Sequence, residues 1–271
     1  MNIKQMNIKK EAFSMNRFGL LVKRDLLSSY RAILIRIAAA SGVLLFVDLM
    51  SLWQDGPDLF HHIEVFTAVL FVGGFIATSG AFREVHRKET NQSYLLIPAS
   101  PLEKVISKIT FYTVGWIILT AVWYTLYILV VYGAGELLLG SHYPLHGPFH
   151  PQLLTVYAHY IVLQSIFLIG AIFFRRTNFF KTALAMFVLL LLLALIMAIF
   201  FRIVFASYFT GLCIFDVTAW APFEAMFPYQ FSGLMEIMNS VKNVVYWGIL
   251  APAAWVFTYF RFREVQVKDG I

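Results

Sequence analysis

Six long apolar runs separated by shorter, more polar segments make up most of the 271-residue chain. Each run approaches the roughly 20 residues that a helix needs to cross a bilayer. The pattern predicts an all-α integral membrane protein with six transmembrane helices, forming a single membrane domain over residues 1–271. The predicted spans are residues 33–53, 63–82, 109–132, 152–174, 182–204 and 243–260.

Two of these runs carry a further pattern. The fifth contains "ALAMFVLLLLLALIMAIFF", which is apolar on every side of a helix and is therefore expected to face lipid. The second carries Gly73, Ala77 and Ala81 at helical spacing, which lets another helix approach closely. Ordinary use of small residues in membrane helices is the alternative interpretation.

The segments between the runs predict the orientation. Residues 1–32, 83–108, 175–181 and 261–271 together contain 18 of the 21 Lys and Arg residues. The alternate segments 54–62, 133–151 and 205–241 contain none. Basic residues concentrate on the cytoplasmic side of membrane proteins, so both termini and the segment 83–108 are predicted to be cytoplasmic.

Residues 15–31, which precede the first span, have an amphipathic pattern. Phe18, Leu21, Val22, Leu26 and Tyr30 fall on one helical face, and basic side chains lie nearby at positions 23, 24 and 31. This predicts an N-terminal amphipathic surface helix on the inner face of the membrane. A simple cytoplasmic extension of the first membrane helix is the alternative.

Composition supports lipid as the main solvent. Hydrophobic residues make up 60% of the chain and charged residues 13%, whereas soluble domains have about a quarter charged. The net charge of +6 follows from the cytoplasmic segments, so no nucleic-acid partner is expected. The single cysteine, Cys213, excludes an internal disulfide.

The segment 83–108 is expected to be structured. Its first part, "FREVHRKETNQSYLL", has no helix breaker and can continue the second span until just before Pro98, which disfavours helix in the preceding residue. Ser100 then suits an N-cap, Pro101 the first helical position and Glu103 the third, which completes a capping box. The segment is thus predicted to form two helices with a sharp break. A solvated hairpin is the alternative.

The stretch "TNQSYLLIPASPLEKVISK" resembles the cytoplasmic loop between helices two and three of type-2 ABC-transporter permeases, the export class. In that family a Gly-Thr is followed by an apolar run, Pro-x-Ser, a Glu and a Lys. Glu89 stands here in place of the Gly, and the preceding acidic residues are reduced to Glu84. The residues that keep the family's order and intervals are Thr90, Pro98, Ser100, Glu103 and Lys108.

The resemblance implies that residues 83–108 are a coupling loop that docks on a separate ABC ATPase subunit. Tyr94, Leu95, Leu96 and Pro98 would meet that subunit, with Glu103 and Lys108 fixing the loop. The chain would then be the transmembrane subunit of an exporter in a bacterial-type cytoplasmic (inner) membrane. It would act as a homodimer or as a heterodimer with a second permease. The implied partner-binding set is Glu84, Thr90, Tyr94, Leu95, Leu96, Pro98, Ser100, Glu103 and Lys108.

No nucleotide site is expected on this chain. A phosphate-binding loop needs Gly-x-x-x-x-Gly-Lys-Ser/Thr, and the nearest match, "GELLLGSH" at residues 135–142, lacks the Lys. No cofactor is therefore predicted here, and ATP is expected on the partner subunit.

Two other classes of function are the alternatives. A membrane scaffold or accessory subunit would share the same pattern of spans. An intramembrane enzyme would need paired acids, clustered His residues or an activated nucleophile, and the sequence has no HExxH, GxSxG or paired Glu on a span. His159 is alone in the fourth span and is expected to be packed or hydrogen-bonded, so no catalytic residue is predicted and the chain is not expected to be an enzyme.

Two outer segments carry candidate features. His142, His146 and His150 have a spacing that suits metal ligands on a helix, but Pro and Gly residues at 144, 147 and 148 interrupt that helix, so no metal site is predicted. The segment 205–241 is apolar and split by prolines, which predicts an external re-entrant or interfacial segment.

Charged residues inside the spans complete the list of candidates. Arg36 lies near the inner end of the first span and can extend its charge to the membrane surface. Asp48 and Arg202 lie near the outer ends of the first and fifth spans. An unpaired charge at such depth is costly, so an intramembrane pair between Asp48 and Arg202 is one hypothesis. Two independent charges at the outer interface are the alternative.

Overall fold

The computed structural model describes residues 13–54, 59–139, 150–204 and 232–269, and all regular secondary structure in these ranges is helical. Five helical stretches are long and apolar enough to cross a membrane, as expected for a multi-pass membrane protein. They are Met15–Val47, Phe66–His86, Pro101–Val131, Pro151–Phe173 and Asn178–Phe200. The sixth predicted span, 243–260, is also helical, in η4 (Val244–Ile249) and α13 (Leu250–Asp269). Its membrane crossing stays a prediction, as does the cytoplasmic position of the termini.

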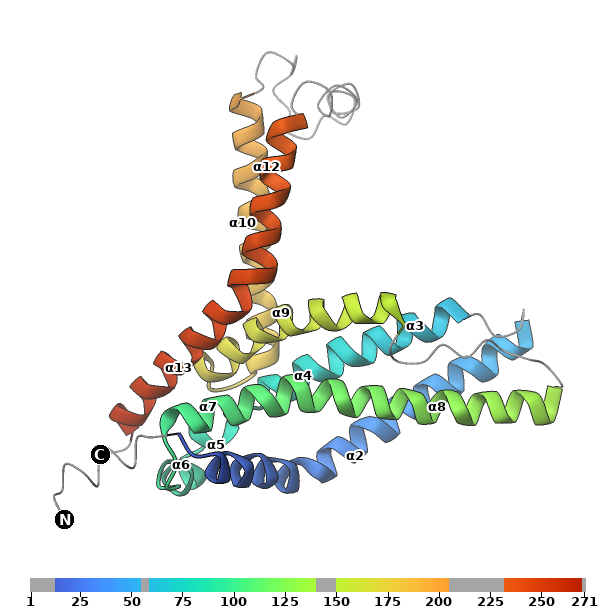
Figure 1. Cartoon of the computed structure of the whole chain (residues 1–271), viewed down its shortest axis with the longest axis horizontal. Coiled ribbons are helices and arrows are strands. Elements are labelled where there is room, and N and C mark those ends of the chain that lie inside the picture. Colours follow the sequence, from blue (N-terminus) through green and yellow to red (C-terminus); the bar gives the residue numbers. More distant parts are fainter. Residues whose placement is uncertain (1–12, 55–58, 140–149, 205–231, 270–271) are drawn as a thin grey trace.

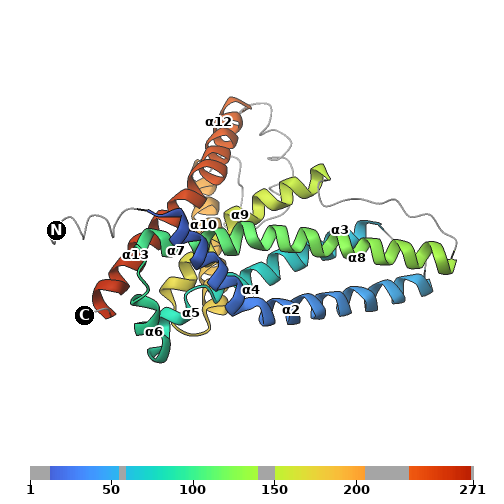
Figure 2. The ribbon, with the colours of Figure 1, turned by 60° about the horizontal axis from the view of Figure 1, so that its bottom comes forward.

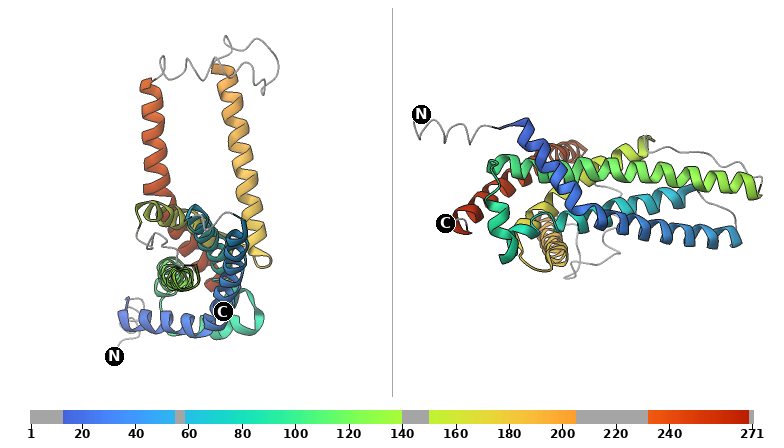
Figure 3. Two further views of the ribbon diagram at one scale, coloured as in Figure 1. Left: turned by 90° about the vertical axis from the view of Figure 1, so that its right-hand side faces the viewer. Right: turned by 90° about the horizontal axis from the view of Figure 1, so that it is seen from below.

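The N-terminal amphipathic stretch is not a separate helix. It forms the first part of α2 (Met15–Gln54), a continuous helix that runs on into the first span. Figure 3 shows that α2 changes direction along its length, so that its first part lies crosswise to the rest. Leu21 and Asp25 are buried against the protein, whereas Leu26 and Tyr30 are exposed. The predicted apolar face is therefore divided between a protein contact and an open surface.

The second and third spans pack closely through π-helical turns. The second consists of α3 (Leu59–Ala68), η1 (Val69–Gly73) and α4 (Gly74–Ser79), and the third of α7 (Pro101–Thr110), η2 (Phe111–Gly115) and α8 (Trp116–Leu139). The Trp116 indole N–H donates to the Leu70 carbonyl at 3.0 Å, and a Cβ at Gly73 would lie 2.8 Å from the Trp116 ring. The predicted close approach of another helix is thus confirmed at Gly73, whereas Ala81 lies in the turn that follows α4.

A buried polar network fixes the fourth span, α9 (Pro151–Phe173), to its neighbours. The Thr113 hydroxyl donates to the Gln164 side-chain oxygen at 2.9 Å, and the Gln164 amide donates to the Thr78 hydroxyl at 3.2 Å. Polar groups inside a membrane must find protein partners, so this network ties α9 to α4 and η2 at one register.

Two apolar clusters lie along the bundle. One contains Leu44, Phe66 and Trp123 and joins α2, α3 and α8. The other contains Phe82, Tyr94 and Phe262 and joins the segment 83–108 to α13. The second cluster makes the predicted loop part of the folded core.

The fifth span has very different surroundings. No residue of the apolar window in Asn178–Phe200, within α10 (Asn178–Val204), is buried. Figure 1 shows α10 and α12 (Ser232–Asn243) extending away crosswise to α2, α3 and α8, and Figure 3 shows them standing apart from each other. We call α10, α12 and η4 the apolar arm. Its exposure agrees with the prediction that the fifth apolar run faces lipid.

His142 and His146 of the other outer segment lie outside the described residues, and so does most of the predicted external segment 205–241. The remaining part of that segment begins α12, which continues through η4 into α13. It is thus the start of a long helical stretch and not an isolated short helix.

Candidate functional site

The segment 83–108 forms three short helices at one end of the bundle, beside the end of α13 (Figure 2). They are α5 (Arg83–His86), α6 (Lys88–Leu95) and the start of α7. The predicted continuous extension of the second span is wrong, because a turn follows Ser79 and Arg87 adopts extended backbone between α5 and α6. The turn places Phe82 and Val85 in the core, and the Thr90 hydroxyl donates to the Glu84 carbonyl at 2.9 Å across the second break.

The predicted break before α7 is confirmed. Helix α6 ends at Leu95, before Pro98, and Ser100 adopts extended backbone as the N-cap of α7. The Ser100 hydroxyl accepts from the Glu103 backbone N–H at 3.2 Å, and the Glu103 carboxylate accepts from the Ser100 N–H at 2.7 Å. Pro101 occupies the first helical position, so the capping box is complete.

Glu103 also binds the start of α2. Its other carboxylate oxygen accepts from the Ser14 backbone N–H at 2.6 Å and from the Arg17 guanidinium at 2.9 Å. Glu103 is fully buried, and each carboxylate oxygen has a charged or backbone donor. One side chain therefore caps α7 and holds α2 in place.

Two further ion pairs join α2 to the loop. The Lys108 ammonium lies 2.8 Å from Asp25 Oδ1 and 3.9 Å from Glu84 Oε2, and both Lys108 and Asp25 are buried. The Arg24 guanidinium lies 2.7 Å from Glu84 Oε1 in a partly exposed position. We call this set the charged junction: Arg17, Arg24, Asp25, Glu84, Glu103 and Lys108.

Tyr94 lies at the centre of the charged junction with an exposed fraction of 1%. The Arg24, Lys104 and Lys108 charges lie 5.2, 5.6 and 5.4 Å from its ring centre, within cation–π range. The Tyr94 hydroxyl has no hydrogen-bond partner among the described residues. Burial, together with the nearby Asp25 and Glu84 carboxylates, raises the pKa of Tyr94 well above its ordinary value.

The remaining predicted docking residues divide into two groups. Leu96 is 80% exposed, and Pro98 and the neighbouring Leu102 are also exposed. Leu95 is half-buried and packs on the core cluster beneath the loop, while Tyr94 is inside it. Tyr94 thus supports the loop from within, and Leu96 and Pro98 form its accessible surface.

The sequence pattern alone did not single out half of the charged junction. Arg17, Arg24 and Asp25 belong to α2, whose basic residues were assigned to the lipid surface. Asp25 offered a usable signal, because this acid follows Leu21 by four positions and so shares its helical face. An acid on the apolar face of a basic helix indicates a buried partner, here Lys108.

The other candidates are not brought together into a site. The Asp48 side chain lies outside the described residues, and Figure 1 shows that the ends of α2 and α10 point in different directions. The arrangement gives no support to the Asp48–Arg202 pair. His159 is hydrogen-bonded as expected, with its Nδ1 at 2.8 Å from the Tyr246 hydroxyl. Among the described residues no group of His, Cys, Asp and Glu could hold a metal ion.

Comparison with known proteins gives no match: no protein-family model, no curated protein and no solved structure is similar to this chain.

Proposed function

We propose that this chain is the transmembrane subunit of an ABC exporter and that residues 83–108 are its coupling loop. The resemblance of that loop to type-2 permeases motivates the proposal. The observation that carries it is the loop's construction: buried charges hold it against α2, and Leu96 and Pro98 are presented on its surface.

This construction suits the transmission of force from a partner. A docking surface can move membrane helices only when it is joined firmly to them. The loop is continuous with α4 and α7, it is ion-paired to α2, and Tyr94 packs against Phe262 of α13. A displacement at Leu96 would therefore reach four helical segments. The exporter would draw its energy from ATP bound to a separate ATPase subunit, and a second permease chain would complete the transport path.

The docking surface is tested by Leu96→Asp, with Ser93→Asp as the matched control. Both positions are exposed on the loop, so each variant adds one negative charge without disturbing the core. The full-length chain is purified from its native membrane, and ATP hydrolysis by the co-purifying protein is measured. We expect ATPase activity with the unaltered chain and with Ser93→Asp, and its loss with Leu96→Asp. A native preparation without ATPase activity would favour a membrane scaffold or accessory subunit.

The proposal also includes six spans with both termini in the cytoplasm. The alternating distribution of basic residues supports this topology. Reporter fusions after residues 95 and 265 should read cytoplasmic, and a fusion near residue 145 should read external. An external reading after residue 95 would contradict the topology and the docking proposal together.

A further inference from the structure

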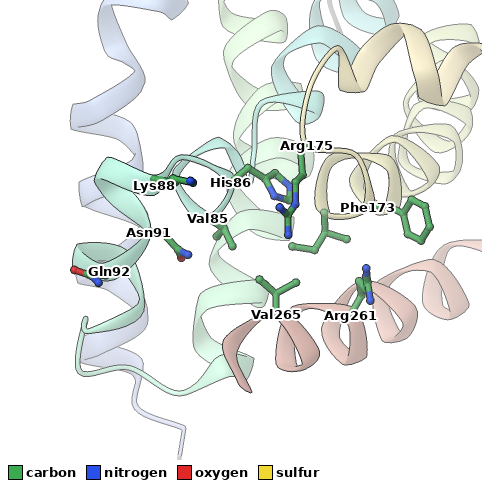
Figure 4. Close-up of a pocket in the computed structure, with 10 residues that line it drawn as sticks. Val85, His86, Lys88, Asn91, Gln92, Phe173, Arg175, Arg261 and Val265 are labelled. Carbon is green, nitrogen blue, oxygen red and sulfur yellow. The ribbon is translucent and has the colours of Figure 1, made fainter. Parts of the chain in front are cut away.

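A second feature at the loop end of the bundle is a pocket of about 410 Å³. It is formed by α5 and α6, the end of α9, the residue Arg175 that follows α9, and α13 (Figure 4). None of its lining residues belongs to the charged junction. It is therefore a separate space beside the loop.

The polar lining of this pocket is cationic. Lys88, Arg175 and Arg261 line it together with His86 and the neutral Asn91 and Gln92, and no carboxylate among the described residues does. Arg175 and His86 both line the pocket (Figure 4), and contact between His86 Nε2 and the Ala171 carbonyl at 3.0 Å holds the imidazole ring. Arg261 also pairs with Glu264, outside the lining, so Lys88 and Arg175 are the cations of this space whose mutual repulsion a bound anion would relieve.

The rest of the lining combines apolar walls with two polar atoms that have no partner. Val85, Ile172, Phe173 and Val265 form the apolar part. Arg261 Nε and Asn91 Oδ1 are buried and make no hydrogen bond among the described residues. The remainder of the Arg261 guanidinium pairs with Glu264 and lies 5.4 Å from the Phe173 ring centre, so the side chain is fixed in position.

We propose that this pocket binds a phosphate-bearing anion. A phosphate offers several acceptor oxygens that match guanidinium donors, and Arg and Lys recognise it by charge-assisted hydrogen bonds. Arg175, Lys88 and the free Nε–H of Arg261 supply the donors. Asn91 Oδ1 accepts from a hydroxyl of the bound group.

Two sources can supply this chemistry. The first is the headgroup of an anionic lipid, because the pocket lies at the end of α9, beside a basic segment of the kind that faces anionic lipid. The apolar walls would then contact the glycerol and the upper acyl chain. The second is free inorganic phosphate. The inference stands without the exporter proposal, since it needs neither an ATPase nor transport.

The test compares two double variants that remove the same charge. Arg175→Gln/Arg261→Gln alters the pocket, whereas Arg176→Gln/Arg263→Gln alters the adjacent basic residues that do not line it. The full-length chain in a zwitterionic detergent is titrated with phosphatidylglycerol, and binding is followed by native mass spectrometry. Phosphatidylcholine serves as the control lipid, and inorganic phosphate is added as a competitor.

We expect the phosphatidylglycerol Kd to rise by about ten-fold or more in the pocket variant and by less than about two-fold in the control variant. Equal weakening in both variants, or none in either, would overturn the proposal, because binding would then follow overall charge or lie elsewhere. Competition by millimolar phosphate in the unaltered chain would identify free phosphate as the ligand. Its absence would identify the lipid headgroup.

A second comparison applies if the pocket double variant does not fold. Lys88→Gln alters an exposed pocket residue, and Lys23→Gln alters an exposed lysine of α2 that does not line the pocket. We expect Lys88→Gln to weaken phosphatidylglycerol binding by roughly three-fold and Lys23→Gln to leave it unchanged. Equal effects of the two substitutions would again overturn the proposal.

Discussion

The charged junction and the apolar arm differ in what surrounds their side chains. In the charged junction, acids and bases from α2, α5 and α7 pair with one another, and Asp25, Glu103 and Lys108 are buried in protein. In the apolar arm, Leu190, Leu191 and Val244 point outward with more than half of their surface open. The conformation of the charged junction therefore depends on individual ion pairs and hydrogen bonds, whereas the apolar arm is expected to depend on contact with lipid.

The two regions also differ in direction. The charged junction closes one end of the bundle, while the arm extends crosswise to α2, α3 and α8 (Figure 1). If α10 and the spans of the bundle cross one bilayer, their axes must lie closer to the same membrane normal, and the arm would then have to turn relative to the bundle. Residues 174–177 connect α9 to α10, and Thr177 there has a φ of 53°. Few individual pairings oppose such a turn, because the arm makes contacts mainly at its base.

The strongest test of the contrast is Lys108→Met, which leaves the buried Asp25 carboxylate without its main partner. Breaking a buried ion pair from one side costs about 3–5 kcal/mol of unfolding free energy. Reversible unfolding in mixed detergent micelles measures the change, with the exposed Lys23→Met as control. The double variant Asp25→Leu/Lys108→Met should recover most of the stability, because no isolated charge remains. A single-variant loss of under about 1 kcal/mol would show that the pair contributes little.

A smaller loss of unfolding free energy is expected for Glu103→Gln. The amide keeps the size of the side chain but removes the charge that pairs with Arg17 and one of the two acceptor oxygens, which serve the Ser14 and Ser100 N–H groups. Hydrogen bonds to charged groups contribute more than neutral ones, so about 2 kcal/mol should be lost. The same unfolding measurement applies, with Glu89→Gln on the exposed side of α6 as control. Similar losses from both substitutions would indicate a general charge effect.

Tyr94→Phe should separate the contribution of the aromatic ring to stability from the contribution of the hydroxyl group. The substitution removes a buried hydroxyl that has no hydrogen-bond partner in the part of the chain that the structure describes, and it keeps the ring close to the three cations. Stability at pH 7 should therefore be unchanged or higher by about 1 kcal/mol. Because the folded-state pKa of Tyr94 is raised, the stability due to its protonated form is present below pH about 10 and is lost as the pH rises further. The variant should therefore lose less stability than the unaltered chain above pH about 10. Parallel pH profiles for the two proteins would contradict this account, and Tyr30→Phe at an exposed position is the control.

The smallest change in unfolding free energy is expected for a substitution in the apolar arm. Leu191→Ala shortens a side chain that is exposed on the surface of α10. The unfolding free energy in detergent should therefore change by less than about 0.5 kcal/mol. The matched substitution Leu168→Ala, at a fully buried position of α9, should cost about 2–5 kcal/mol. A comparable cost at Leu191 would mean that the arm is packed against protein in solution, which would remove the distinction between the two regions.

The sequence predicted the features that depend on local chemistry. The capping box of α7 needs only Ser100, Pro101 and Glu103 at fixed intervals, and all three take their expected places. Apolar length likewise predicted the five candidate spans, because length and hydropathy are local properties.

Features that depend on distant contacts could not be predicted in the same way. The break before α5 begins at Gly80, the C-cap of α4, which is a local signal for the end of a helix. The break before α6 lies in a stretch without a helix breaker and accompanies the burial of Phe82 and Val85 in the core. The pairing of Asp25 with Lys108 joins residues 83 positions apart, and the basic pattern around Asp25 had favoured lipid contact. The sequence pattern presented the pocket cations Arg175 and Arg261 only as members of basic segments that were predicted to be cytoplasmic.

The continuity of α2 has a mechanical consequence. At 1.5 Å per residue, its 40 residues follow a bent path of about 60 Å that begins beside the loop and includes the first predicted span. An unbroken helix conveys rotation as well as translation, because every backbone hydrogen bond along it resists twisting. A small tilt imposed at Arg17 and Asp25 would therefore become a larger lateral displacement at the opposite end, with the bend in α2 serving as the pivot.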